Sequence, residues 1–291
     1  MLKPDKSLGL CGPLDHPDML RLKLCIDSIL KRCSFGAMIV SKGGIGKTRS
    51  IRQIIENSGL IEGKDWIHVA ANITDTELYK ILYDNNDKII FFDDIGTASK
   101  SQAGITILKQ ATETKDGNNR IISWTSPTYI LKDYPTSFAF TGYLIMCLNI
   151  RPNVRNGDIE ALTSRFLSCI IDISNKTILE MIYSLKYSLS EDANPEEFEM
   201  IFDYVCEIGN EESDINIRVF KNAIIWHKLN DNWKKFVEED LGFDNDTKTV
   251  IEIITDGYKG KQATEIWRTR TGKKKSSFYS LLEKIKKHNL I

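Results

Sequence analysis

Cysteine and histidine are scarce in this chain, and neither forms a cluster of the kind that holds a metal. The 291 residues include six cysteines without a close pair and four histidines. Scattered cysteines are typical of reduced thiols in a cytosolic protein rather than of a disulfide-bonded scaffold. No histidine lies at metal-ligand spacing from a cysteine, so we expect no structural zinc site.

Long apolar runs are also absent. No segment approaches the roughly 20 apolar residues of a membrane span, and the N-terminal sequence MLKPDKSLGL lacks the apolar core of a secretory signal. Hydrophobic residues make up 42% of the chain and charged residues 27%, which predicts a packed globular protein. We therefore expect no membrane partner and a cytoplasmic location, in the host cytoplasm if the protein is viral.

The net charge of −1 hides an uneven distribution. Between Gly257 and Ile291 there are ten basic and two acidic residues, so this tail carries +8 and the rest of the chain must carry −9. A basic tail on an acidic body is typical of a module that binds a polyanion.

Apolar segments of strand length alternate with helical segments over the first 174 residues. This order, with short connections, predicts an α/β fold in which helices cover a parallel sheet. Residues 120–124 could form a further strand or part of a hairpin. The predicted strands span residues 37–40, 67–71, 88–92 and 143–148, and the predicted helices span residues 17–31, 47–57, 78–83 and 105–112.

Beyond residue 174 the apolar residues recur at helical spacing, and no strand-like run intervenes. We expect a small all-α domain with helices at residues 178–189, 198–206 and 215–229. Residues 240–246 are interpreted as a hinge that leads to the basic tail. The predicted domains are residues 1–174, 175–239 and 247–291.

The sequence SKGGIGKT at residues 41–48 matches the phosphate-binding loop G-x-x-x-x-G-K-[ST], except that Ser41 replaces the first glycine. Its glycines let backbone N–H groups face the phosphates, Lys47 can reach the outer phosphates, and the Thr48 hydroxyl can hold Mg²⁺. The alternative is an ordinary glycine-rich turn, which the strand before it and the helix after it disfavour. The predicted nucleotide-binding residues are Gly43, Gly44, Ile45, Gly46, Lys47, Thr48 and Arg49.

Two adjacent carboxylates end the predicted strand at residues 88–92. Asp93 stands where a Walker B aspartate would support Mg²⁺. Asp94 would orient or polarise the water that attacks the phosphate. Adjacent acids at a strand end could instead belong to a solvated loop, but a strand that follows a phosphate-binding loop at this distance favours the metal site.

Taken together, these residues resemble the AAA+ ATPases over about residues 17–230. Asn149 follows the next core strand and matches the polar sensor residue of that family, and Arg165, in EALTSRF, matches its arginine finger. Arg218 begins a predicted helix and matches the second sensor arginine of the family's helical lid. The segments ELYKILYDNNDKIIFFDD and PTSFAFTGYLIMCLN look like those of AAA+ ATPases carried by large bacterial viruses.

The resemblance implies ATP and Mg²⁺ as cofactors and a ring of identical subunits in which Arg165 acts in trans. Arg151 and Arg155 are alternative fingers, because they lie near the same strand end. The family usually has glutamate where Asp94 stands. Aspartate is one methylene shorter, so hydrolysis could be slow, or the site could act as a nucleotide switch. The implied catalytic residues are Lys47, Asp94, Asn149, Arg165 and Arg218.

The basic tail has the pattern of a helix-turn-helix or winged-helix module. Residues 261–269 predict a short helix, Gly272 a turn, and residues 273–287 a second helix with an apolar stripe. This second helix would be the recognition element. The alternative is an exposed lysine-rich helix that merely packs on the body. The predicted DNA-binding residues are Lys273, Lys274, Lys275, Ser276, Ser277 and Tyr279.

Three functions fit these patterns. The first is an oligomeric DNA-binding ATPase, of helicase, helicase-loader or initiator type, with a possible protein partner such as a helicase. The second is a protein remodeller whose basic tail recognises an acidic adaptor. Residues 70–74 lack the aromatic residue expected of its pore loop, which disfavours it. The third is a regulator that uses nucleotide to set its oligomeric state.

Overall fold

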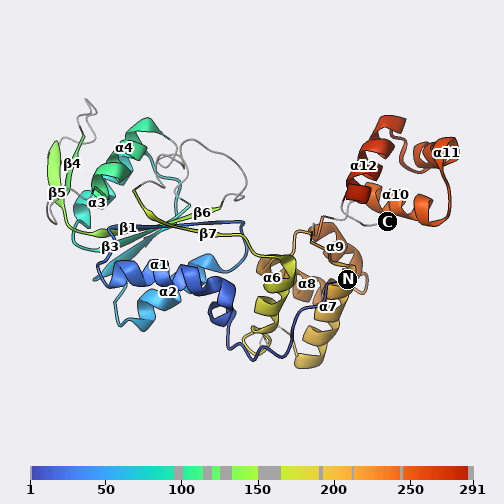
Figure 1. The fold of residues 1–291 in the computed structure, drawn as a ribbon, viewed down its shortest axis with the longest axis horizontal. Coiled ribbons are helices and arrows are strands. Elements are labelled where there is room, and N and C mark those ends of the chain that lie inside the picture. Colours follow the sequence, from blue (N-terminus) through green and yellow to red (C-terminus); the bar gives the residue numbers. More distant parts are fainter. Residues whose placement is uncertain are drawn as a thin grey trace. The chain divides into compact units, whose positions relative to one another are not determined.

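The computed structural model describes residues 2–94, 101–113, 120–124, 133–149, 165–189, 193–211, 213–242 and 245–287 (Figure 1). The chain forms two compact units. One unit, the sheet unit, consists of Leu10–Ile173. The other, the helical unit, combines Met1–Gly9 with Ser174–Ile291. Among the described residues, no helix is both long and apolar enough to cross a membrane.

The sheet unit is built on five strands in the order β2-β3-β6-β1-β7, and every pairing is parallel. All six residues of β1 are buried, as expected for a central strand that is covered on both faces. This sheet confirms the predicted α/β class, although β7 was not predicted. The strands are β1 (Gly36–Ser41), β2 (Trp66–Val69), β3 (Ile89–Asp93), β6 (Tyr143–Asn149) and β7 (Leu167–Ile171).

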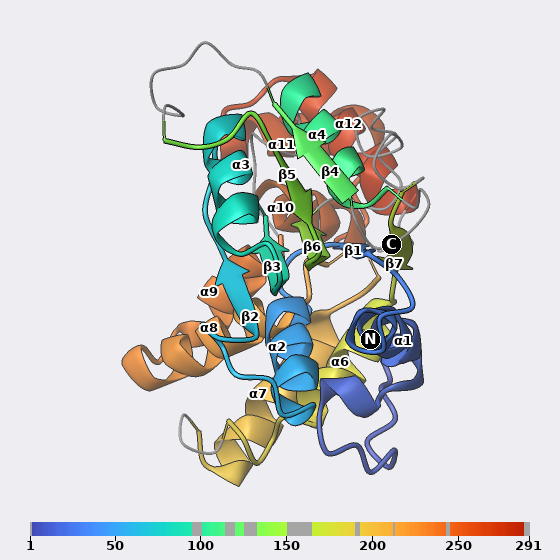
Figure 2. The same cartoon turned by 90° about the vertical axis from the view of Figure 1, so that its left-hand side faces the viewer.

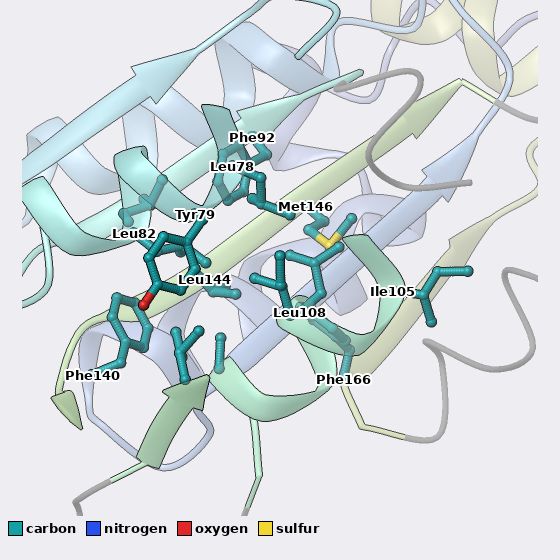
Figure 3. Close-up of a cluster of buried hydrophobic side chains, with 14 of the residues drawn as sticks. Leu78, Tyr79, Leu82, Phe92, Ile105, Leu108, Phe140, Leu144, Met146 and Phe166 are labelled. Atoms are coloured by element: carbon teal, nitrogen blue, oxygen red, sulfur yellow. The ribbon is translucent and has the colours of Figure 1, made fainter. Parts of the chain in front are cut away.

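Helices cover both faces of the sheet. Figures 1 and 2 show α1 and α2 on one face and α3 and α4 on the other. On the α3 and α4 face, Leu78 and Tyr79 from α3 and Leu108 from α4 pack against Phe92 and Met146 of the strands (Figure 3). The helices are α1 (Leu20–Leu30), preceded by short 3-10 turns, α2 (Lys47–Asn57), α3 (Asp75–Asp84) and α4 (Gln102–Ala111).

Residues 120–124 belong to a separate antiparallel pair of strands. Strand β4 (Arg120–Ser123) pairs with β5 (Ser137–Phe140). Trp124 packs against the core under α3, with its ring centroid 5.7 Å from that of Tyr79. Trp124 therefore contributes to packing, and this part of the segment is a strand. Residues 125–129 lie outside the described residues.

Arg120 is a buried cation, only 3% exposed. Its guanidinium donates to the carbonyl of Ala111 at 2.7 Å and to that of Gly142 at 2.5 Å. The same group lies 4.1 Å from the centroid of the Phe35 ring. Burial lowers the pKa of Arg120 to about 10. The side chain thus joins the end of α4, strand β4 and the turn before β6, since each carbonyl needs a donor once it is out of water.

The first four helices of the helical unit after residue 174 are packed around aromatic rings. Phe198 and Phe202 of α7 contact Phe220 of α8, at centroid distances of 5.1 and 6.1 Å. A capping box between Asn194 and Glu197 begins α7. The helices are α6 (Asn175–Tyr183), α7 (Pro195–Ile208), α8 (Ile217–Leu229) and α9 (Trp233–Asp240).

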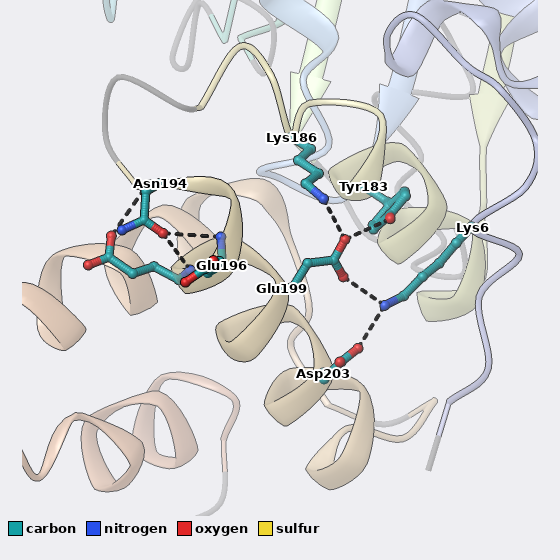
Figure 4. A network of polar contacts seen from close by, with 8 residues as sticks. Lys6, Tyr183, Lys186, Asn194, Glu196, Glu199 and Asp203 are labelled. Atoms are coloured by element: carbon teal, nitrogen blue, oxygen red, sulfur yellow. Dashed lines mark hydrogen bonds and ion pairs between the residues drawn. The ribbon is translucent and has the colours of Figure 1, made fainter.

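The N-terminal segment is tied to these helices by Lys6. Its ammonium donates to Glu199 at 2.9 Å and to Asp203 at 2.8 Å (Figure 4). Glu199 also accepts from Lys186 at 2.6 Å and from Tyr183 at 2.8 Å. The network explains why residues 1–9 group with the helical unit although they precede the sheet in sequence.

The basic tail forms the two expected helices, and a third helix that was not predicted precedes them. Helix α10 (Asn245–Thr255) precedes α11 (Gly260–Thr271) and α12 (Lys275–Lys287). Because α10 begins at Asn245, the predicted hinge at 240–246 extends too far, and its last two residues are helical. The apolar face of α10 completes a small core with the other two helices. That core consists of Val250, Ile253, Ala263, Trp267, Phe278 and Ile285.

The Glu199 network predicts a pH-dependent stability. Burial alone would raise the pKa of Glu199, but hydrogen bonds from Lys186, Lys6 and Tyr183 outweigh it and lower the pKa from 4.5 to about 2. A carboxylate with a lowered folded-state pKa stabilises the fold above its unfolded-state pKa and loses that contribution as the pH falls through the folded-state value. We expect Glu199→Gln to lower the free energy of unfolding at pH 7, measured by urea denaturation. The difference from wild type should shrink from pH 4.5 towards pH 2.

The matched control is Glu207→Gln, an exposed position on the same helix. Its difference from wild type should be small and should not follow this acid transition. An equal loss of stability in both variants would contradict the role given to Glu199.

Candidate functional site

The predicted phosphate-binding loop connects β1 to α2 at the carboxyl edge of the sheet. Strand β1 ends at Ser41 and α2 begins at Lys47. Gly44 and Gly46 have φ angles of 79° and 88°, in the left-handed region that favours glycine. No side chain caps the start of α2. The first turn of α2 presents the positive end of a helix, which attracts an anion.

Lys47 holds its charge inside the loop, and the side chain is only 4% exposed. Its ammonium donates to Ser41 Oγ at 2.7 Å, the Lys42 carbonyl at 2.9 Å, Asn149 Oδ1 at 2.9 Å and the Ser41 carbonyl at 3.3 Å. The hydroxyl of Ser41 donates in turn to the Lys42 carbonyl at 2.8 Å. The residue that replaces the first glycine of the motif thus contributes two oxygens to the lysine.

The two predicted acidic residues both make contacts at the same edge. Thr48 Oγ1 donates to Asp93 Oδ2 at 2.7 Å. Asn149 Nδ2 donates to Asp94 Oδ2 at 3.3 Å, so Asn149 contacts both Lys47 and Asp94. Asp94 adopts a left-handed backbone with φ 58°, and its N–H donates to the Cys147 carbonyl at 2.9 Å. Residues from three separate segments therefore meet at one edge of the sheet in two contacting sets, Lys47 with Asn149 and Asp94, and Thr48 with Asp93.

The residues at this edge fit Mg²⁺ that arrives with a nucleotide. A hydroxyl and a carboxylate oxygen in contact are hard ligands of the kind that Mg²⁺ takes, usually together with substrate phosphates and water. Within the described part of the chain, no group of three or more His, Cys, Asp or Glu side chains could hold a metal by itself. Thr48 and Asp93 suit a shared metal–phosphate site rather than a site made by protein alone.

The predicted arginines that the structure describes come from other segments of the chain. Arg165 directly precedes β7, and its exposed guanidinium is 3.8 Å from Glu113. Arg218 is the second residue of α8 in the helical unit, where Asn216 caps the helix. Arg151 and Arg155 lie outside the described residues. The roles of Arg165 and Arg218 stay predictions.

The sequence analysis missed two polar residues beside Asp93. His68 of β2 places Nε2 at 3.7 Å from Asp93 Oδ2, and Arg52 of α2 places a guanidinium nitrogen at 3.3 Å from His68 Nδ1. The sequence places His68 on the strand before the acidic strand, but it does not indicate a contact with Asp93.

The predicted DNA-binding residues lie around the turn between α11 and α12. Gly272 ends α11 with φ 69°, and Trp267 Nε1 donates to the Lys274 carbonyl at 3.3 Å, which fixes the turn against the small core. Lys275 lies over the ring of Tyr279, 5.6 Å from its centroid. Ser277 is half-buried, and the exposed predicted residues are Lys273, Lys274, Lys275, Ser276 and Tyr279.

No family model and no curated protein matches the chain. Solved structures resemble it weakly. The Holliday junction branch migration motor RuvB of Thermotoga maritima is 16% identical with a TM-score of 0.45, over 92% of this chain and 86% of that one. The replication initiator DnaA bound to AMPPCP and single-stranded DNA is 12% identical with a TM-score of 0.47, over 92% and 87%. A Walker-type ATPase of Pyrococcus abyssi is 12% identical with a TM-score of 0.42, over 99% and 93%. At these values none of the similarities assigns an activity to this chain.

The contacts of Lys47 predict opposite effects of two substitutions. Lys47→Ala should weaken ATP binding by at least about tenfold, because a hydrogen bond to a charged group contributes roughly 1.5–3 kcal/mol. Ser41→Ala should bind ATP at least as tightly as wild type, because it removes an oxygen that competes with phosphate for the ammonium. Titration calorimetry measures both. Weaker binding by Ser41→Ala would mean that the hydroxyl supports the bound state instead.

Proposed function

We propose that the chain is an oligomerising AAA+ ATPase that binds DNA and couples ATP binding and hydrolysis to DNA replication or remodelling. The observation that carries the proposal is the pair of contacting sets at one sheet edge, Lys47 with Asn149 and Asp94, and Thr48 with Asp93. A phosphate-binding loop, a metal-binding carboxylate, a second carboxylate and a polar sensor are the parts that phosphoryl transfer to water requires.

Each residue has a distinct task in this proposal. The loop amides and Lys47 bind the phosphates, and Lys47 exchanges its present oxygen partners for phosphate oxygens. Thr48 and Asp93 would hold Mg²⁺, which neutralises charge on the outer phosphates. Asp94 orients the attacking water, and the amide of Asn149 fixes the Asp94 carboxylate. Arg165 of a neighbouring subunit and Arg218 would stabilise the charge that develops during transfer.

The DNA-binding part of the proposal rests on the three-helix tail. Its apolar side chains are used by its own core, which leaves the lysines at the start of α12 exposed. Lysines and hydroxyl groups at the start of a recognition helix suit phosphate and base-edge contacts. The charge of +8 between Gly257 and Ile291 supplies the electrostatic attraction that non-specific DNA binding requires.

One observation favours a second candidate, a nucleotide-switched DNA-binding regulator with little hydrolysis. Asp94 is shorter than the glutamate usual in the family, and it already accepts a hydrogen bond from Asn149. A carboxylate that cannot reach the water would leave ATP bound but intact. Single-turnover hydrolysis separates the candidates, because a motor cleaves bound ATP and a switch retains it.

The DNA-binding tail is tested by charge removal. The triple variant Lys273→Ala, Lys274→Ala and Lys275→Ala should bind duplex DNA more weakly. Its plot of log affinity against log salt should be shallower by about 2–3, since each phosphate contact contributes about 0.9 to the slope. Fluorescence anisotropy over a salt series measures both quantities. ATP hydrolysis with and without DNA is measured in parallel, and wild type should respond to DNA.

A matched control removes the same charge from the helical unit through Lys228→Ala, Lys234→Ala and Lys235→Ala, all exposed positions. This control should keep the wild-type salt dependence. If wild type neither binds DNA at modest salt nor changes its hydrolysis rate with DNA, the DNA-directed function is wrong.

Action of Arg165 in trans is tested by mixing variants. Arg165→Ala should bind ATP normally but lose assembly-dependent hydrolysis, by up to about 10³–10⁵-fold if it is a finger of full strength. Mixing it with Lys47→Ala, which retains Arg165, should restore part of the hydrolysis rate. Mixing it with the double variant Lys47→Ala/Arg165→Ala should restore none. Normal hydrolysis by Arg165→Ala alone would show that the finger is another residue.

A further inference from the structure

His68 faces the carboxylate of Asp93 because of the pairing between β2 and β3. His68 is registered with Phe91, and Phe91 and Asp93 are alternate residues of β3 on one face of the sheet. The imidazole stacks on Phe91 with ring centroids 4.8 Å apart. This stack points Nε2 along the strand towards Asp93 Oδ2, at 3.7 Å. The same oxygen accepts the hydrogen bond from Thr48.

The position of the imidazole proton follows from Arg52. A guanidinium nitrogen of Arg52 lies 3.3 Å from His68 Nδ1. A guanidinium can only donate, so Nδ1 accepts and the ring proton is on Nε2, the nitrogen that faces Asp93. Arg52 is itself held by Glu62 at 2.6 Å and by the ring of Trp66, 5.6 Å from its centroid.

The Nε2–H group of His68 has no hydrogen-bond acceptor among the described residues. The nitrogen atom itself is buried. A buried donor without an acceptor is unfavourable, and a small movement of the carboxylate towards Nε2 would supply the missing hydrogen bond. Arg52 lies one helical turn after Thr48 on α2. One helix therefore reaches Asp93 twice, directly through Thr48 and indirectly through Arg52 and His68.

We propose that His68 is a positioning residue for Asp93. Its Nε2–H holds Oδ2 of the carboxylate, and Arg52 fixes the tautomer that makes this possible. Hydrogen-bond partners of this kind orient the side chains that ligate metals. The inference rests on the proposed nucleotide function, and it adds that Mg²⁺-dependent nucleotide binding needs the series Arg52, His68 and Asp93. The competing role for His68 is packing against Phe91 alone.

Two substitutions at His68 separate these roles. His68→Phe keeps a ring that can stack on Phe91 but removes the N–H. His68→Gln loses the ring but offers an amide N–H. Binding of a non-hydrolysable ATP analogue is measured by calorimetry across a Mg²⁺ series and in EDTA. His68→Phe should require roughly tenfold more Mg²⁺ for half-maximal enhancement of binding, the lower end of the effect known for such partners. Binding in EDTA should match wild type, and His68→Gln should restore part of the Mg²⁺ response.

The control is His227→Phe in the helical unit, where the imidazole contacts Trp233 at a centroid distance of 5.3 Å. It should leave the Mg²⁺ response unchanged. A wild-type response in His68→Phe would overturn the inference while leaving nucleotide binding intact. If wild type binds no nucleotide, the inference and the proposed function both fail.

A measurement on the wild-type protein tests the inference even if the variants do not fold. Nitrogen-15 NMR of the His68 ring should show the proton on Nε2. A proton on Nδ1 in its place would overturn the inference, because the ring would then present no donor to Asp93.

Discussion

The parallel pairing of β1, β6 and β3 is the constraint on which the rest of the site depends. Main-chain hydrogen bonds register Ser41 with Asn149 and Asp93 with Cys147. The three strands therefore end at the same edge. Strand pairing alone brings together side chains that are more than 100 residues apart in the sequence. A shift of one residue in either pairing would turn Asn149 or Asp93 to the opposite face of the sheet.

The sequence predicts those helices and strands whose bounds are set by nearby residues, and it misses those that depend on distant contacts. Helix α2 was predicted at its observed bounds, because its start is set by the loop sequence around Gly46 and its end by Ser58 and Gly59. Strand β7 was missed, because LSCII is a short segment whose strand conformation depends on pairing with β1. Helix α10 was not predicted, because its apolar residues Val250 and Ile253 form a core only with residues of α11 and α12.

The candidate site divides in the same way. The motif residues Lys47, Thr48 and Asp93 could be assigned from sequence, because glycine spacing and an acidic strand end carry their chemistry locally. The contact of His68 with Asp93 could not, since it depends on the register between β2 and β3 and on the orientation of α2. A histidine in an apolar strand has no sequence pattern that separates a positioning residue from a packing residue.

The contacts of Ser41 give a physical role to the residue that replaces the first glycine of the motif. A buried ammonium needs oxygen partners, and the partners of Lys47 include two carbonyl oxygens, a hydroxyl oxygen and an amide oxygen. Phosphate oxygens carry charge and form stronger hydrogen bonds than carbonyl, amide or hydroxyl oxygens do. The proposed nucleotide binding would therefore exchange these neutral oxygens for charged phosphate oxygens. Ser41 supplies two of these neutral oxygens. Its contacts therefore allow the Lys47 ammonium to remain buried without a phosphate.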